Sequence, residues 1–233
     1  MTDITTEDLA RLADWDTPTI CNGLELINPA WRLSGYTVQP FACVRPEAKP
    51  MVGYARTATI RAGSVPSRSA EEMRDARLAY YDYIDRGPKP SITVIQDLDS
   101  EPGVGAWWGE VNSTIHAGLG SLGTITNGSI RDLADFAPGF QGLAGKIGPS
   151  HAHVRVTGHG GTIEVHGMTV RDGDIVHADC HGAVVVPVSA VRELPDVIGL
   201  IARREAVMLE AASKPGFTSD ALRAAMAEAA KIT

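Results

Sequence analysis

Arg131 and Asp132 are adjacent and of opposite charge, and they closely follow a turn-like Asn127-Gly128. Glu110 precedes them, with twenty residues between it and Arg131. A guanidinium is a planar fork that suits a carboxylate, and carboxylate oxygens are the hard ligands that Mg²⁺ or Mn²⁺ prefers. These three side chains could therefore hold a small keto acid, with its carboxylate at Arg131 and its carbonyl at a metal.

A βαβ unit would bring these residues together. Residues 92–97 form a short apolar run typical of a buried strand, and a glycine-rich loop over 102–110 leads into a predicted helix at 111–119. A second strand is predicted at 122–126, with Asn127-Gly128 as the turn at its carboxyl end. Ligands of parallel sheets gather at the carboxyl ends of strands. The free N–H groups that begin the helix, at Val111, Asn112, Ser113 and Thr114, would add an anion site.

The same residues also have a structural interpretation. A glutamate near a helix start stabilises the helix dipole without any catalytic role. An exposed Arg–Asp pair contributes little to stability and is common on surfaces. Spacing alone leaves both interpretations open.

The other predicted elements surround this unit in an α/β arrangement with helices at both ends. Asp16 caps a helix that contains Pro18, and Ser69 with Glu72 forms a capping box. Residues 31–50 are predicted to be irregular. The predicted helices cover residues 5–14, about 17–24, 71–85, 189–213 and 218–231, and the remaining predicted strands cover 51–62, 153–157, 162–167 and 183–187.

The composition excludes several classes of protein. The chain of 233 residues is 44% hydrophobic with a net charge of −7, so it lacks the basic surface that nucleic acid requires. No apolar run approaches the roughly 20 residues of a membrane span. The acidic start MTDITTEDLA is unlike a secretory signal, and three scattered cysteines fit reduced thiols. A cytoplasmic protein is expected.

Several segments, taken in order, resemble one family. Glu110, Arg131 and Asp132 resemble the D-x20-R-D signature of the RraA-like proteins, which include the class II 4-hydroxy-4-methyl-2-oxoglutarate aldolases and their oxaloacetate decarboxylase relatives. The matching segments are Met51–Ala58, Trp108-Gly109, Gly123–Asp132, Val170–Asp179 and Gly182–Pro187. Their common order across about residues 15–190 indicates the fold.

The resemblance implies a single α/β domain over 1–233, a swivelling-domain (β/β/α) sandwich with helical N- and C-terminal extensions, the latter at 189–231. It also implies homotrimers or dimers of trimers with sites between subunits. By the same resemblance, Arg131 holds the substrate carboxylate, Asp132 contacts a divalent metal, and Glu110 holds a metal-bound water. Glu205, from a neighbour's C-terminal helix, is expected to help.

The chain departs from the family pattern in places. Glu110 is one methylene longer than the usual aspartate, and Asn22 stands where many members carry Asp. The segment 150–156 is rich in histidine. If its histidines converged with later ones, they would suggest a proton donor or an altered pocket. The residues concerned are His151, His153, His177 and His181, whose spacing matches no tetrahedral zinc pattern.

The expected function is a metal-dependent lyase that cleaves a C–C bond of a 2-oxo acid and releases pyruvate. Trp107 and Trp108 are expected to wall its pocket, or equally to be interface or core residues. Two alternatives stay open: a lyase of the same fold for a different acid, with a histidine-rich pocket, and a non-enzymatic regulator of ribonuclease activity. The complete acid–Arg–Asp set favours an enzyme, because an interaction surface has no need of it.

Overall fold

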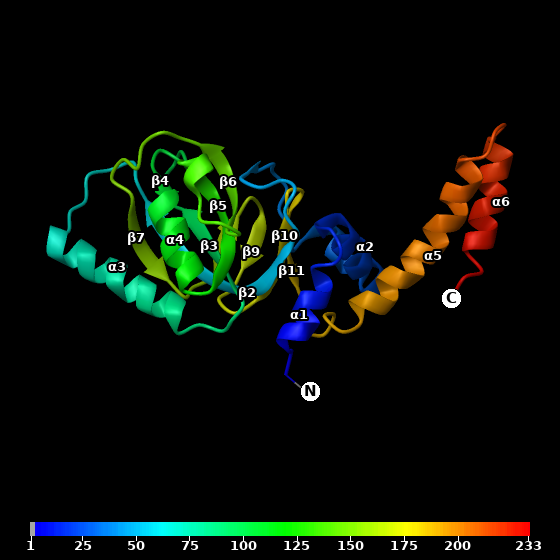
Figure 1. Cartoon of the computed structure of the whole chain (residues 1–233), viewed down its shortest axis with the longest axis horizontal. Coiled ribbons are helices and arrows are strands. Elements are labelled where there is room, and N and C mark those ends of the chain that lie inside the picture. Colours follow the sequence, from blue (N-terminus) through cyan, green and yellow to red (C-terminus); the bar gives the residue numbers. More distant parts are fainter. Residues whose placement is uncertain (1–2) are drawn as a thin grey trace.

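A nine-stranded sheet forms the centre of the molecule in a computed structural model, which describes residues 3–233 (Figure 1). The strand order is β1-β6-β5-β3-β2-β10-β11, with β4 beside β5 and β7 beside β2. Strands β8 and β9 form a separate hairpin. The strands are β1 Ala42–Cys43, β2 Met51–Arg61, β3 Ser91–Asp97, β4 Ala106–Trp108, β5 Ser121–Ile130, β6 Gln141–Ile147, β7 Arg155–His159, β8 Ile163–Val165, β9 Met168–Val170, β10 Ile175–Asp179 and β11 Gly182–Val186.

The middle of the sheet is parallel, because β2, β3, β5 and β6 pair in the same direction. In β3 and β5 the β-branched side chains are buried on both faces, as central parallel strands require. One face packs on the β8–β9 hairpin through Val94, Ile125 and Met168. The other face packs on Tyr80 and Trp108. The βαβ unit predicted from sequence is present as β3, α4 and β5.

The helices are α1 Thr6–Leu12, α2 Thr17–Ile27, α3 Ala70–Asp85, α4 Glu110–Gly118, α5 Leu194–Ala212 and α6 Ser219–Ala229, with short 3₁₀ turns at Pro29–Leu33 and Leu133–Asp135. The Ser69–Glu72 capping box and the Asp16 cap are both confirmed. Thr218 caps α6. Figure 1 shows α5 and α6 projecting from one end of the molecule, away from the sheet. No helix within residues 3–233 is long and apolar enough to cross a membrane.

The predicted turn at Asn127-Gly128 is wrong, because β5 continues through it to Ile130. The register with β6 shifts between Thr126 and Ser129, so the dipeptide lies at a bulge. The Asn127 side chain accepts from the Asp97 N–H at 2.7 Å and donates to the Asp97 carbonyl at 3.0 Å. These bonds to the neighbouring strand hold an Asn-Gly pair inside a strand.

Local patterns failed for several strands. β1, β4, β6, β9 and β10 were not predicted, and β7 begins two residues later than the predicted strand at 153–157. The last long helix begins at Leu194 rather than residue 189. Short strands such as β4 and β9 contain three residues each, too few for a period-2 pattern to show in the sequence.

Candidate functional site

Arg131 and Asp132 lie immediately beyond the carboxyl end of β5, beside the start of α4. The Arg131 N–H donates to the Trp108 carbonyl at 3.0 Å, which joins the end of β5 to β4. The two side chains form an ion pair, with 3.6 Å between Nε and Oδ2. Their side chains are 36% and 33% exposed, so both groups remain accessible to a ligand.

Gly109 makes room for the Asp132 carboxylate. Asp132 has a left-handed backbone, with φ 51° and ψ 45°, which is uncommon outside glycine, asparagine and aspartate. A Cβ added at Gly109 would lie 2.5 Å from Asp132 Oδ2 and 3.2 Å from Arg131 Cγ. The pair therefore packs directly on the residue that precedes α4. Sequence reasoning placed Gly109 in a motif but did not assign it this role.

The amino end of α4 has no side-chain cap. Its unpaired N–H groups are those of the first turn, Glu110 to Asn112. This corrects the predicted anion site, because the Ser113 N–H already donates to the Gly109 carbonyl at 3.0 Å. Val111 is 66% exposed, and Glu110 and Thr114 are also exposed. The first turn thus presents a carboxylate and free amides to solvent.

Buried groups hold α4 in place beneath this surface. His116 Nε2 forms a hydrogen bond with the Tyr80 hydroxyl at 2.7 Å. Its Nδ1 lies 2.6 Å from the Asn112 carbonyl. The Asn112 side chain donates to the Trp107 carbonyl and accepts from the Tyr81 hydroxyl. Burial lowers the pKa of His116 to about 4, with a smaller opposing effect of the Asn112 hydrogen bond. The imidazole is therefore neutral near pH 7 and serves the scaffold.

Trp108 is a core residue, so of its expected places the core position holds and the pocket wall does not. Its side chain has no exposed area and packs against His116 and Phe140, with ring centroids 4.5 and 5.5 Å away. Its carbonyl, rather than its indole, contributes to the site, because it accepts from the Arg131 N–H.

The four histidines do not converge. His177 is buried, lies opposite Val52 on β2, and bonds Thr17 through Nδ1. The His153 N–H donates to the carbonyl of Ala62, just past the far end of β2. Val52 and Ala62 are ten residues apart along the chain, so the rise per residue of a strand separates His177 from His153 by roughly 30 Å. His151 is exposed in the same loop as His153, and His181 is exposed in the β10–β11 turn. A shared histidine pocket is thereby ruled out within this chain.

Glu205 lies on α5, at the opposite end of the molecule from α4 (Figure 1). It lines a cavity of about 220 Å³ between α2 and α5, together with Asn22 and Arg204. It cannot reach Arg131 of its own chain. The expected contribution of Glu205 to a neighbour's site stays a prediction.

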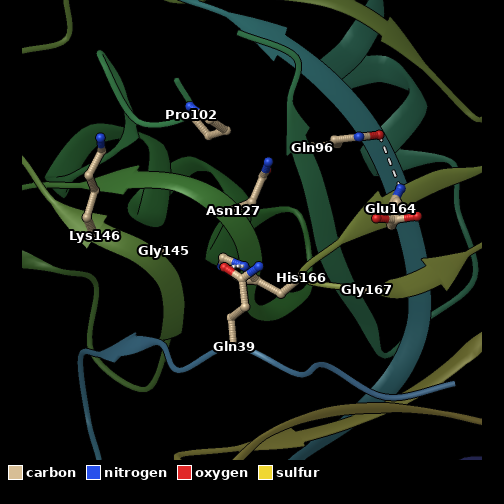
Figure 2. Close-up of a pocket in the computed structure, with 9 residues that line it drawn as sticks. All are labelled: Gln39, Gln96, Pro102, Asn127, Gly145, Lys146, Glu164, His166 and Gly167. Atoms are coloured by element: carbon tan, nitrogen blue, oxygen red, sulfur yellow. Dashed lines mark hydrogen bonds between the residues drawn. The ribbon is translucent and has the colours of Figure 1, made fainter. Parts of the chain in front are cut away.

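A separate polar cavity of about 420 Å³ lies near the carboxyl ends of β3, β5 and β6 (Figure 2). Its polar lining residues are Gln39, Gln96, Asn127, Lys146, Glu164 and His166. Several of them are already paired, as in the 2.9 Å contact between His166 Nδ1 and Gln39 Oε1. Arg131, Asp132 and Glu110 are outside this lining. The charged pair thus faces an open surface rather than the cavity of Figure 2.

Comparison with known proteins shows what the chain is similar to. A solved structure of an uncharacterized protein from Pseudomonas syringae pv. tomato is 21% identical, with a TM-score of 0.70, and covers 96% of this chain and 95% of its own. RraAS2 of Streptomyces coelicolor, described as an unusual member of the RNase ES inhibitor RraA family, is 22% identical, with a TM-score of 0.65, and covers 84% and 92%. At these identities the likeness shows the fold.

A curated relative, protein DlpA of Legionella pneumophila, is 26% identical over 123 residues. That match covers 48% of this chain but only 18% of DlpA, so the chain spans a small part of that relative. Residues 17–185 match the RraA-like family, described as Aldolase/RraA. The matched region contains β1 to β10, most of β11 and the Arg131–Asp132 pair, and the mixed α/β sheet agrees with the solved relatives. The chain belongs to the RraA-like family.

Proposed function

We propose that this chain is a divalent-metal-dependent lyase that cleaves a C–C bond of a small 2-oxo acid and releases pyruvate. The family includes aldolase-type members and ribonuclease inhibitors, so membership alone does not choose between them. The observation that carries the proposal is the accessible Arg131–Asp132 pair packed on Gly109 at an uncapped helix start. A binding surface for another protein does not require this arrangement.

Arg131 and α4 would bind the substrate's carboxylate. The guanidinium offers two parallel N–H donors, and the free amides of the first turn of α4 add donors and a positive dipole end. The ion pair with Asp132 is monodentate and long at 3.6 Å between Nε and Oδ2, so it leaves donors of Arg131 for a ligand. This orients the 2-oxo group toward Asp132.

The donors present fit a hard divalent cation. Asp132 and Glu110 offer accessible carboxylate oxygens, which suit Mg²⁺ or Mn²⁺ that keeps several waters. The missing Cβ at Gly109 leaves the Asp132 carboxylate its place beside α4. When bound, such an ion supplies Lewis-acid stabilisation of the charge that develops at the 2-oxo oxygen.

In retro-aldol cleavage of a 4-hydroxy-2-oxo acid, the C3–C4 bond breaks and its electron pair passes into the C2–C3 bond. Glu110, or a water that it holds, accepts the proton of the C4 hydroxyl, which becomes a carbonyl. The same proton then returns to C3 to give the methyl group of pyruvate. With oxaloacetate the bond that breaks releases carbon dioxide instead. The neutral buried His116 is committed to Tyr80 and Asn112, which favours Glu110 as the base.

The direct test measures pyruvate release from oxaloacetate and a panel of 4-hydroxy-2-oxo acids, with and without Mg²⁺ or Mn²⁺. Activity should require the metal. Arg131→Ala should lose nearly all turnover, whereas Arg171→Ala, an exposed residue in the β9–β10 turn, serves as the matched control. Absence of pyruvate under every condition would refute the proposal. Capture of an RNA-degrading partner by such an inactive protein would favour the regulator instead.

We also propose that the active form is a homo-oligomer, a trimer or a dimer of trimers, with sites completed by a neighbouring subunit. The projecting α5–α6 arm exposes Leu209 at 69% and Met226 at 53%, which a second copy could cover. Mixing inactive Arg131→Ala and Glu205→Ala proteins under subunit exchange should restore part of the activity. No recovery from verified mixed oligomers would exclude a shared site with Glu205.

A further inference from the structure

The two-residue turn between β10 and β11 gathers three potential metal ligands from consecutive residues. Asp179 and Gly182 pair across the hairpin, and Cys180 and His181 form its tip. Both tip residues are exposed, whereas Asp179 is 5% exposed. The ligand atoms of Asp179, Cys180 and His181 all lie within 4.8 Å of one another.

The distances resemble those around a small tetrahedral ion. His181 Nδ1 lies 3.1 Å from Asp179 Oδ1 and 3.7 Å from Cys180 Sγ. Tetrahedral zinc with ligands at about 2.0–2.3 Å places those ligands roughly 3.3–3.8 Å apart. Only small side-chain shifts would therefore bring the three atoms into coordination.

The aspartate is held in place by one distant residue and by one residue of its own turn. Asp179 Oδ2 accepts from the Thr17 N–H at the start of α2 at 2.8 Å, and Oδ1 accepts from the His181 N–H at 2.8 Å. The Thr17 hydroxyl in turn contacts His177 Nδ1 at 3.0 Å. These hydrogen bonds fix the carboxylate, as partners of a ligand do in established metal sites.

A cavity and a second thiol adjoin the turn. His181 lines a cavity of about 140 Å³ that also contains Cys21, from α2. Cys43, on β1, packs against the core cluster that contains Ala178 and Ala183 of the same hairpin. Cys21 is therefore the second thiol beside the hairpin tip.

We propose that the β10–β11 turn is a second metal site, which binds a zinc ion through Asp179, Cys180 and His181, with the fourth position open to water from the adjoining cavity. Sulfur and imidazole ligands select Zn²⁺ over Mg²⁺, because soft and borderline donors suit zinc and hard oxygen donors suit magnesium. The site is independent of the proposed lyase activity, since its ligands and those of the Arg131 site are on different elements.

Binding requires that the Cys180 thiol gives up its proton to solvent and that neutral His181 carries its remaining proton on Nε2. The step balances with one proton passing from the thiol to solvent for each zinc bound. No electron transfer accompanies the step, because zinc does not change its oxidation state.

Cobalt provides a direct optical readout. The full-length protein, stripped of metal with a chelator and kept reduced, is titrated with Co²⁺ and then with competing Zn²⁺. We expect a thiolate-to-cobalt absorption band that saturates at about one equivalent and is displaced by zinc. Cys180→Ser should abolish the band, and His181→Asn should weaken zinc binding more than about 100-fold, beyond the roughly 10–100-fold that changes to residues around the ligands cost.

Two matched variants locate the site. Cys43→Ser removes a neighbouring thiol that is not a ligand, and Asp132→Asn removes the carboxylate of the other site; both should keep the band. Absence of a thiolate–cobalt band at one equivalent overturns the proposal. So does a band that persists in Cys180→Ser, or one that disappears in Cys43→Ser.

Discussion

The start of α4 and the β10–β11 turn both place a carboxylate beside a polar ligand group, but they do so in opposite ways. Asp132 is one-third exposed and rests on a glycine beside free helix amides. Asp179 is buried and accepts backbone N–H groups from two elements. The first region offers oxygen donors and a guanidinium to an organic acid, whereas the second adds sulfur and imidazole and no guanidinium.

The difference shows how one fold can separate two kinds of metal chemistry. An accessible aspartate can share a hydrated hard cation with a substrate, because open positions remain for exchange. A preorganised aspartate next to a thiol and an imidazole favours retention of zinc. Each region also has a buried histidine beneath it, His116 in α4 and His177 in β10, and burial lowers the pKa of both.

The largest expected effect is a loss of activity when the Arg131–Asp132 site is altered but not when the β10–β11 turn is altered. Asp132→Asn should lower kcat/KM for pyruvate release about 1,000-fold, since it removes the carboxylate that would hold the cation, and the cation stabilises the developing negative charge. Cys180→Ser should change the same constant less than about twofold, because it leaves the hard-metal site intact. Rates measured over a range of Mg²⁺ concentrations test this. Similar losses in both variants would show that the regions are not independent.

Lowering the pH should reduce the free energy of unfolding, because the buried His116 in α4 must become protonated. The reference pKa of histidine is 6.5 and that of folded His116 is about 4, so the unfolded chain binds the proton first as pH falls. The stabilisation is complete above pH 6.5 and is lost progressively toward pH 4, by about 3 kcal/mol at 1.36 kcal/mol per pKa unit.

Urea unfolding at pH 7.5, 5.5 and 4.5 measures this effect. His116→Gln should unfold more easily at pH 7.5 and lose part of the acid dependence. The exposed His151→Gln is the control and should keep the wild-type slope. An unchanged slope in His116→Gln would show that another group governs acid stability.

Zinc should stabilise only the protein with an intact hairpin tip. At a free zinc concentration 100 times the dissociation constant, binding to the folded state adds about 2.7 kcal/mol to the free energy of unfolding. Cys180→Ser should show no such gain, and without metal it should be within about 0.5 kcal/mol of wild type because the residue is exposed. Thermal unfolding with and without zinc provides the comparison. Equal gains in both proteins would place the zinc elsewhere.

The smallest effect concerns the room beneath Asp132. Gly109→Ala places a Cβ 2.5 Å from Asp132 Oδ2, so the carboxylate must move, and we expect about a 10-fold loss of activity, or 1.4 kcal/mol. The backbone of Gly109, with φ −171°, is one that alanine also adopts, so folding should persist. Gly118→Ala at the other end of α4 has no atom within 4 Å and is the matched control. Full activity in Gly109→Ala would mean that Asp132 tolerates displacement.

Much of the fold could be predicted from sequence because its signals are local. The Ser69–Glu72 capping box and the Asp16–Pro18 start each lie within one turn of helix, where neighbours along the chain decide the structure. The apolar run at β3 and the βαβ order could be predicted in the same way. The single-domain organisation and the roles of Arg131, Asp132 and Glu110 stay predictions.

Other features depended on contacts between distant residues. Asn127-Gly128 is part of a strand because Asp97 bonds the asparagine side chain, which outweighs the local preference for a turn. Short strands such as β4 pair only where a longer neighbour provides partners. Sequence spacing also suggested that the histidines could converge, but His177 and His153 lie at opposite ends of β2.

By itself, the sequence determined the family, the α/β order of elements and the adjacency of Arg131 to Asp132. Tertiary structure alone decided that Trp108 turns into the core, that Gly109 lies under Asp132, and that Thr17 reaches across 162 residues of chain to hold Asp179. The physical reason is that local patterns record the preferences of neighbouring residues. Burial and hydrogen bonding between remote segments determine which side chains a ligand can meet.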